Sequence, residues 1–183
     1  MSRVFITGST DGLGRAAARA LIHERAAAVH DLAPLSLGVV VGDLGNAIET
    51  RGVADQVNAL GRMDAVIHNA GVYLTKGRSS TPEGHAAVLA VSTLAPYILT
   101  ALIERPRRLV HLSSGMHRGG AGPLSDIDWI TRRWDATRAY QRASCTSRRS
   151  PSPPRASGRM YSATPWTQAG CRRRWAEPAH RMI

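Results

Sequence analysis

The stretch Val4-Phe5-Ile6-Thr7-Gly8-Ser9-Thr10-Asp11-Gly12-Leu13-Gly14 decides the fold of this chain. A short apolar run, typical of a buried strand, enters a turn with three glycines, and the turn opens into an alanine-rich segment typical of a helix. This arrangement seats the diphosphate of a dinucleotide, because glycines permit a sharp turn, close approach of the backbone to the phosphates and tight helix packing. We expect the diphosphate contacts from Gly8, Ser9, Asp11, Gly12, Leu13 and Gly14.

The first 140 residues alternate strand and helix patterns. Apolar runs predict strands at 3–7, 38–42, 64–68 and 107–112, and helical spacing predicts helices at 12–23, 46–60 and 81–102. The last of these helices is expected to begin with a Thr81 cap and with Pro82 in its first turn. The alternation predicts an α/β fold, a doubly wound parallel sheet of Rossmann type, with ligands beyond the carboxyl ends of the strands.

Residues 141–183 show no such period. They hold five of the ten prolines and nine arginines against one acidic residue, whereas 15 Lys and Arg oppose 12 Asp and Glu in 1–140. This composition predicts a disordered basic tail, 141–183, after a partial dinucleotide-binding domain, 1–140. Since the excess positive charge belongs to the tail, we expect no nucleic-acid partner, although Trp166 and Trp175 could stack on bases.

Other bulk features exclude further classes of protein. No apolar run reaches the length of a membrane span, and the chain enters a strand at once, so we expect neither a membrane segment nor a secretory signal. Cys145 and Cys171 fit no metal-binding or disulfide pattern, and the seven histidines show no ligand spacing. We therefore expect a cytoplasmic protein without a metal.

Taken together, the motifs resemble those of the short-chain dehydrogenase/reductase family. The segment 7–14 fits its glycine motif, and Asp43-Leu44 fits the acidic position that meets the adenine ring. Asn69-Ala70-Gly71 matches the family's Asn-Ala-Gly, Ser114 the catalytic serine and Tyr140 the catalytic tyrosine. The segment 126–140 is similar to the retinol-dehydrogenase-like branch. The resemblance implies that Asp43, Leu44, Asn69, Ala70 and Gly71 contact the cofactor.

The resemblance also implies an activity: hydride transfer between NAD or NADP and a small-molecule alcohol or carbonyl substrate. Tyr140 would act as general acid or base at the substrate oxygen, and Ser114 would steady that oxygen. The choice between NAD and NADP stays open, because no ribose-reading residue is identifiable and Asp11 offers no positive charge for a 2′-phosphate. Members of the family often form homo-oligomers, and this too stays open.

Three departures from the family pattern bear on activity. Ser144 stands where a lysine, one helical turn after the tyrosine, would favour the deprotonated phenol. Ser92 stands where the family places an asparagine that supports a proton relay. Between Gly14 and Asp43 the chain is too short for the usual second strand, unless 26–29 forms a makeshift one. We therefore expect impaired turnover; the alternative is a catalytically inactive dinucleotide-binding remnant acting as a binding or interaction module.

The tail fits the hypothesis that the reading frame slips by one base near Tyr140. Codons rebuilt from the third base of one codon and the first two of the next permit Tyr-Ser-Ala-Ser-Lys-Leu over 140–145, which restores the lysine. They permit Asn-Ala-Val-Asp-Pro-Gly within 163–174, and the single codons of Trp and Met force Val, Asp, Gly and Asp at 160–161, 166–167, 175–176 and 182–183. Without the last strands of the family fold, the sheet edge would stay open and stability would be marginal.

Overall fold

The computed structural model describes residues 3–28, 38–73, 75–120, 124–149 and 160–162. Its centre is a parallel four-stranded sheet in the order β1-β2-β3-β4. The strands are β1 (Val4–Ile6), β2 (Ala65–His68), β3 (Arg108–His111) and β4 (Met160–Ser162). Each of the first two pairs is in register from its first residue, Val4 with Ala65 and Ala65 with Arg108. This confirms the predicted parallel α/β sheet.

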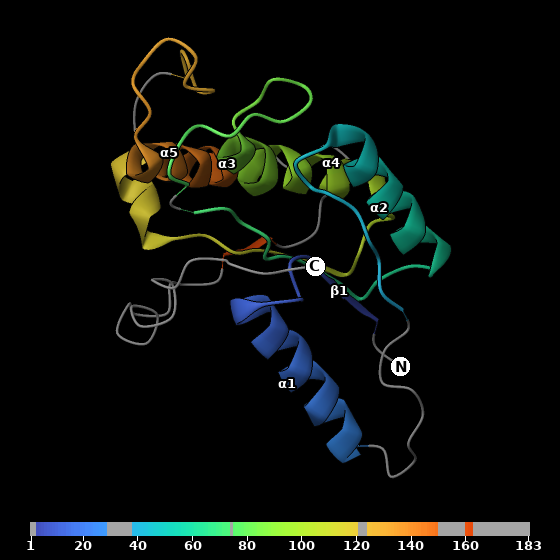
Figure 1. Ribbon diagram of the computed structural model, residues 1–183. Helices are drawn as coiled ribbons and strands as arrows, with labels where there is room; N and C mark the ends of the chain where they lie inside the picture. Colours follow the sequence, from blue (N-terminus) through green and yellow to red (C-terminus); the bar gives the residue numbers. More distant parts are fainter. Residues whose placement is uncertain (1–2, 29–37, 74, 121–123, 150–159, 163–183) are drawn as a thin grey trace.

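Helices cover both faces of the sheet (Figure 1). Helix α1 (Gly12–Ala28) lies on one face, and α2 (Ala47–Ala59), α3 (Ala87–Leu89), α4 (Ala95–Leu102) and α5 (Ala136–Arg149) lie on the other. A π-helical turn, η1 (Ala90–Leu94), joins α3 to α4, and a 3₁₀ helix, η2 (Gly115–Gly120), follows β3. No helix of the described residues is long and apolar enough to cross a membrane.

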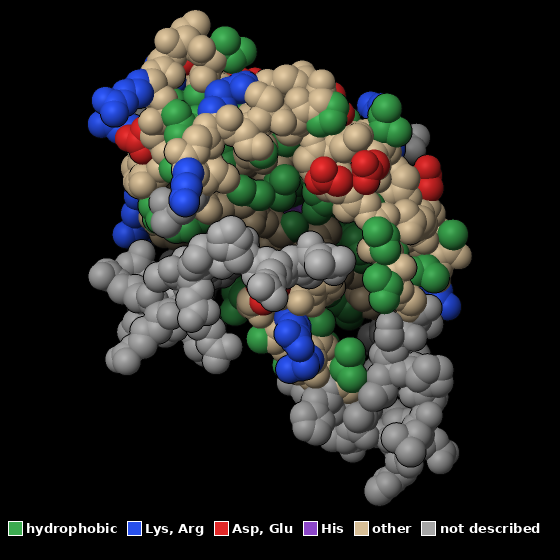
Figure 2. Space-filling view, viewed as in Figure 1, with side chains coloured by type: hydrophobic (Ala, Val, Ile, Leu, Met, Phe, Trp, Pro, Cys, Tyr) green, Lys and Arg blue, Asp and Glu red, His purple; other side chains and the backbone are tan. Residues whose placement is uncertain are grey.

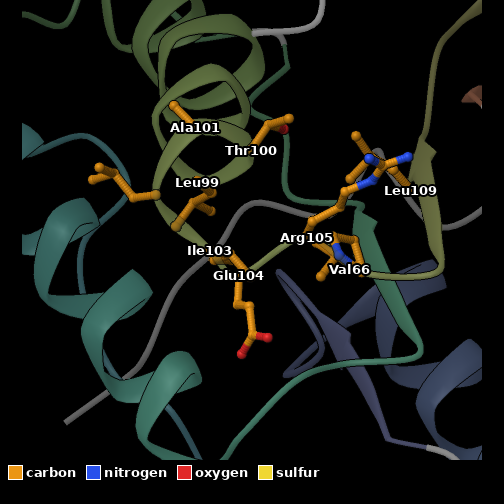
Figure 3. Close-up of a pocket in the computed structure, with 10 residues that line it drawn as sticks. Val66, Leu99, Thr100, Ala101, Ile103, Glu104, Arg105 and Leu109 are labelled. Carbon is orange, nitrogen blue, oxygen red and sulfur yellow. The ribbon is translucent and has the colours of Figure 1, made fainter. Parts of the chain in front are cut away.

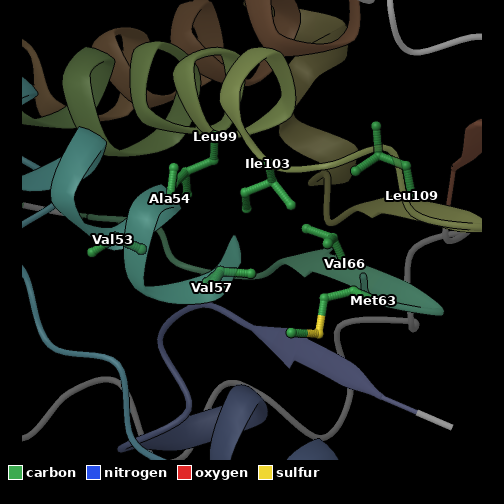
Figure 4. Close-up of a cluster of buried hydrophobic side chains, with 8 residues drawn as sticks. All are labelled: Val53, Ala54, Val57, Met63, Val66, Leu99, Ile103 and Leu109. Atoms are coloured by element: carbon green, nitrogen blue, oxygen red, sulfur yellow. The ribbon is translucent and has the colours of Figure 1, made fainter. Parts of the chain in front are cut away.

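The main core lies between the sheet and the pair α2 and α4 (Figure 4). Val57 of α2, Val66 of β2 and Leu99 of α4 are at most 1% exposed, and they tie the three elements together. The Asn46 side chain accepts hydrogen bonds from the first two amides after Ala47, which fixes the start of α2 as the sequence predicts. A second cluster, around Trp129, joins α3 to α5.

The predicted strand at 38–42 is wrong. The backbone there is irregular, and Val39 and Val41 are 83% and 74% exposed. The Gln56 side chain replaces a neighbouring strand, since its Nε2 donates to the Val41 carbonyl at 3.0 Å. A strand forms only beside a partner, and the described part of the sheet places none next to this segment. The makeshift strand at 26–29 is wrong too for residues 26–28, which belong to α1; residue 29 lies outside the described residues.

The helix expected from Thr81 begins later, at Ala87. The Thr81 carbonyl accepts from Gly84 and its amide donates to the His85 carbonyl, so Thr81 opens a tight turn instead of capping a helix. Gly84 has a φ of +86°, a conformation that ends the turn and excludes a continuous helix. From Ala87 onward the predicted helix is present, and its π turn ends at Leu94, two residues before Pro96.

Order also continues past the expected end of the domain. Helix α5 extends nine residues beyond Tyr140, to Arg149, and β4 pairs with β3 from Leu109 opposite Met160. Both findings correct the expectation of neither helix nor strand after 140. Small residues explain why the helix was missed: Ala139 and Ala143, one turn apart, are 2% and 1% exposed, and their burial needs no large apolar side chain. The remaining tail, with Trp166, Trp175 and Cys171, lies outside the described residues.

Candidate cofactor and active site

The glycine turn between β1 and α1 has the backbone that the sequence predicts. Gly8 and Gly12 have φ values of +66° and +54°, which L side chains rarely adopt. A Cβ on Gly14 would lie 2.1 Å from the Gly8 carbonyl oxygen, so α1 can approach the turn only without a side chain there. The turn therefore presents the amino end of a 17-residue helix to the carboxyl end of the sheet.

A brace of hydrogen bonds joins this turn to the segment after β2. The Thr7 hydroxyl oxygen accepts from the amides of Asn69 and Ala70, both at 3.0 Å. In return the Asn69 side chain donates to the carbonyls of Thr7 and Gly8 at 2.9 and 3.1 Å. Thr7 is 6% exposed, so these bonds are shielded from water. The brace brings Asn69-Ala70-Gly71 against the glycine turn, as expected. Thr7 opens the 7–14 motif, but the motif assigned it no contact, and the brace is its role in the site.

The turn fits a dinucleotide diphosphate, although one carboxylate lies beside it. The first turn of α1 contains no acidic residue, so the amides after Gly12 meet no carboxylate of that turn. Asp11, just outside the helix, accepts from the Gly12 amide at 2.6 Å and adds a negative charge near the phosphates. Leu13 is 60% exposed and Ser9 is half-buried, so both can contact a bound molecule.

Asp43 and Leu44 lie in a turn before α2. The Asp43 carboxylate accepts from the Gly45 amide at 2.7 Å, and the Asp43 amide donates to Glu49 at 2.8 Å. Leu44 packs against the main core. The carboxylate therefore shapes its own turn, and an exposed Asp43 amide is already occupied by Glu49; adenine contact by this pair remains a prediction.

Ser114 lies directly before η2, the 3₁₀ helix that follows β3. Its hydroxyl oxygen accepts from the Met116 amide at 3.2 Å, and its carbonyl accepts from the His117 amide. The hydroxyl hydrogen stays available to donate toward a substrate oxygen. The neighbouring Ser113 Oγ is buried and has no hydrogen-bond partner among the described residues.

Helix α5 carries Tyr140 and packs tightly against η2. A Cβ on Gly120 would meet the Gln141 carbonyl oxygen at 2.1 Å, so the two backbones touch. Thr93 of the π turn donates to the Ala143 carbonyl at 3.0 Å, which holds α5 from the other side. These contacts hold α5, which carries Tyr140, against the 3₁₀ helix that follows Ser114; Tyr140 is half-buried. Ser144, at the position expected for lysine, is 7% exposed.

Two polar groups near this corner lack partners. Ser92 Oγ is buried in the π turn, close to Gly71, and has no hydrogen-bond partner among the described residues. His68, the last residue of β2, donates from Nε2 to Thr100 Oγ1, because the Thr100 hydroxyl itself donates to Pro96. Its Nδ1 is therefore an acceptor without a partner among the described residues. The ring centroids of His68 and His111 are 4.6 Å apart.

A cavity of about 200 Å³ lies elsewhere, at the amino ends of β2 and β3 (Figure 3). It is lined by Val66, Leu99, Thr100, Ala101, Leu102, Ile103, Glu104, Arg105, Pro106 and Leu109. Since ligands of parallel sheets bind at the carboxyl ends, this cavity belongs to the opposite edge and takes no part in the site. Lys and Arg side chains lie scattered over the face in Figure 2. Among the described residues no group of His, Cys, Asp or Glu could hold a metal ion.

The sheet, the glycine turn and its brace define a dinucleotide-binding α/β domain. No family model matches the chain. It is 42% identical over 144 residues to the short-chain dehydrogenase chyC of Penicillium rubens, covering 72% of this chain and 55% of that protein. It is 40% identical over 155 residues to the short-chain dehydrogenase chry4 of Gibberella zeae, covering 76% and 60%. The chain belongs to the short-chain dehydrogenase/reductase family, an oxidoreductase family, and spans over half the length of these relatives.

Solved structures agree on the fold. An uncharacterized protein from Mycobacterium Paratuberculosis matches with a TM-score of 0.64 and 27% identity, covering 79% of this chain and 57% of that one. A short-chain dehydrogenase from Sphingobium yanoikuyae in complex with NADPH matches with a TM-score of 0.54 and 19% identity, covering 80% and 61%. Human retinol dehydrogenase 13 is 32% identical over 85 residues, 43% of this chain and 25% of that protein, so that branch is a more distant relative.

Proposed function

We propose that this chain is the cofactor-binding part of an NAD(P)-dependent oxidoreductase for alcohol or carbonyl substrates, and that its own turnover is impaired. The observation that carries the proposal is the braced glycine turn, in which Thr7 and Asn69 hold the start of α1 open at the sheet edge. The relatives named short-chain dehydrogenases support the reaction class. The neighbour solved with NADPH supports the cofactor class.

The proposed chemistry uses two side chains of the chain itself. The bound nicotinamide cofactor accepts or supplies the hydride. When an alcohol is oxidised, its carbon loses a hydride and its hydroxyl loses a proton to deprotonated Tyr140, so that the carbonyl bond forms and a neutral phenol remains. The Ser114 hydroxyl, whose oxygen already accepts from Met116, donates its hydrogen to the substrate oxygen in both directions.

Impairment is proposed from the environment of Tyr140. A phenol gives up its proton at neutral pH only with help from a nearby positive charge or strong donors. Ser144 supplies neither a charge nor a long donor at the next helical turn. We therefore propose that this chain retains cofactor binding better than it retains turnover. The same reasoning favours a second candidate function, a dinucleotide-binding remnant without turnover.

Cofactor binding and turnover test the proposal separately. NADH and NADPH are titrated into the protein while nicotinamide fluorescence is followed, and the same is done with Gly14→Val, whose side chain would enter the Gly8 backbone. We expect binding that the variant abolishes, and turnover that rises at least tenfold in Ser144→Lys. Binding without turnover in either protein would support the remnant. Absence of binding by the unaltered chain would overturn the proposal.

We further propose that the frame shift near Tyr140 explains the missing lysine. Sequencing the nucleotides around codon 140 and expressing the protein with one base restored test this directly. The restored protein should show a lysine at 144 and turnover well above that of the present chain. A cytoplasmic location and a homo-oligomer through α4 and α5 belong to the same proposal. They are checked by fractionation and sedimentation of the restored protein.

A further inference from the structure

Tyr73 contacts Tyr140, although nothing in the motif analysis singled it out. The two ring centroids are 4.6 Å apart and the ring planes are tilted by 60°. Tyr73 lies two residues after Gly71, at the carboxyl end of β2, and it is 38% exposed. One part of its ring therefore packs on Tyr140, while another part is exposed beside it.

Aromatic side chains gather at this corner of the molecule. The structure describes six Phe, Trp and Tyr side chains, and four of them, Tyr73, Trp129, Trp134 and Tyr140, lie in two contacting pairs here. Trp134 Nε1 donates to the Thr75 carbonyl at 3.3 Å, which ties the segment of Tyr73 to the loop before α5. Trp129 is 4% exposed and packs on Trp134, so it fixes the position of this loop.

The greater burial of the other aromatic side chains leaves Tyr73 as the one that can stack on a substrate. Trp129 is buried and covered by the Arg132 guanidinium, 4.1 Å from the ring centroid, so it serves packing. Tyr73 is the most exposed of these four aromatic side chains, and it contacts Tyr140. A partly exposed ring that is held in place is a surface for stacking a flat partner, at little entropic cost.

We propose that Tyr73 is a specificity-determining residue and that the substrates are aromatic or conjugated carbonyls and alcohols. The proposal rests on the proposed function, since it uses Tyr140 as the reacting phenol. The exposed part of the Tyr73 ring forms a wall beside the reacting phenol, and a planar group stacks on it while the carbonyl oxygen meets Tyr140 and Ser114. A saturated ring of the same size lacks a flat π face and gains less from that wall.

The test compares acetophenone with cyclohexyl methyl ketone, which match in size and differ in planarity. Binding of each ketone to the full chain with NADPH is followed by saturation-transfer NMR. We expect acetophenone to bind several-fold more tightly than cyclohexyl methyl ketone. Tyr73→Leu should reduce the ratio of the two affinities by about 2- to 10-fold, the range of one aromatic contact, and so remove the preference. Tyr73→Phe should retain it. Tyr97→Leu is the matched control, because Tyr97 is 45% exposed on α4, outside the cluster.

The outcomes separate this inference from the function beneath it. Equal binding of the two ketones, no ketone binding, or a preference that survives Tyr73→Leu would overturn the role of Tyr73. NADPH binding is measured in the same samples. If the cofactor binds and only the aromatic preference is missing, the oxidoreductase proposal stands without this inference. If NADPH does not bind while the preference is present, the cofactor proposal fails alone.

Discussion

Thr7 carries more of the site than its size suggests. One hydroxyl oxygen serves two buried amides, those of Asn69 and Ala70, and so links the first two strands at the point where the cofactor is expected. A backbone amide that loses its partner inside a protein costs more than the bond itself contributes. The residue therefore stabilises both the fold and the geometry of the glycine turn.

We predict that Thr7→Val destabilises the chain by about 2–4 kcal/mol, because it leaves two shielded amides without an acceptor. NADPH affinity should fall with it, since Asn69 then loses its fixed position under Gly8. Urea unfolding and fluorescence titration measure the two effects. Thr7→Ser keeps the oxygen and is the control; if it is as unstable as the valine variant, the hydroxyl is not the cause.

The histidines at the ends of β2 and β3 make stability depend on pH. Burial, and secondly the charge of His111, lower the pKa of His68 from 6.5 to about 3. Burial also lowers the pKa of His111. The unfolded chain thus binds protons that the folded chain excludes, so stability is full above pH 6.5 and is lost as the pH falls toward 3. At pH 5, His68 alone costs about 2 kcal/mol.

We predict that His68→Gln flattens this dependence. The amide keeps a donor for Thr100 but does not titrate, so the loss of stability between pH 7.5 and pH 5 should shrink by about 2 kcal/mol. Urea midpoints at both pH values measure it. An unchanged loss in the variant would show that other groups cause the acid sensitivity.

At the scale of elements, the contact between η2 and α5 decides whether Ser114 and Tyr140 share a site. Gly120 lies directly against the α5 backbone, and a methyl group there would meet both the Gln141 carbonyl and Cys145 Cβ, at 2.1 and 2.9 Å. Backbone cannot move aside as a flexible side chain can. The small residue at 120 is therefore a condition for the joint placement of serine and tyrosine.

Gly120→Ala should destabilise the chain by about 1–3 kcal/mol through overpacking. It should also weaken ketone binding, since η2 moves away from Tyr140. Gly115→Ala, in the same helix, is the matched control, because a Cβ there meets no atom within 4 Å. Thermal unfolding of the pair measures the difference, and equal melting temperatures would contradict the close approach.

The elements that sequence alone could predict are those with local signals. The helical spacing of α2, the glycine turn and the apolar runs of β1, β2 and β3 each need only neighbouring residues to be recognised. The segment 38–42 has the composition of a strand, but strand formation depends on a partner that local sequence does not reveal. Thr81 and Pro82 suit both a helix start and a turn, and Gly84 with its positive φ decides for the turn.

The site divides in the same way. Motif spacing predicts that Gly8, Asn69 and Ser114 lie at one sheet edge, because the carboxyl ends of parallel strands meet there. Tyr73 and Thr7 act through contacts with residues distant in sequence, Tyr140 and Asn69. Spacing includes Thr7 in the 7–14 motif, but it reveals neither of these contacts. The extension of α5 was hidden because its buried positions are small residues, which give no apolar period.

At the scale of the whole molecule, the chain exposes surfaces that a complete sheet would cover. Within the described residues, β1 pairs only with β2, so its other edge is open. Val39 and Val41 lie exposed in a segment of strand-like composition. An open edge and an exposed segment of strand-like composition in one molecule are complementary, and such edges promote association between copies.

We predict that the unaltered chain self-associates as its concentration rises and that Val39→Lys with Val41→Lys suppresses this, because charges block strand pairing. Sedimentation velocity at several concentrations measures the change, and circular dichroism should show the same helix content. The control pair is Ile48→Lys with Ile130→Lys, which adds the same charge at side chains that are 75% and 73% exposed. If both pairs suppress association equally, net charge is the cause, and the open segment is not.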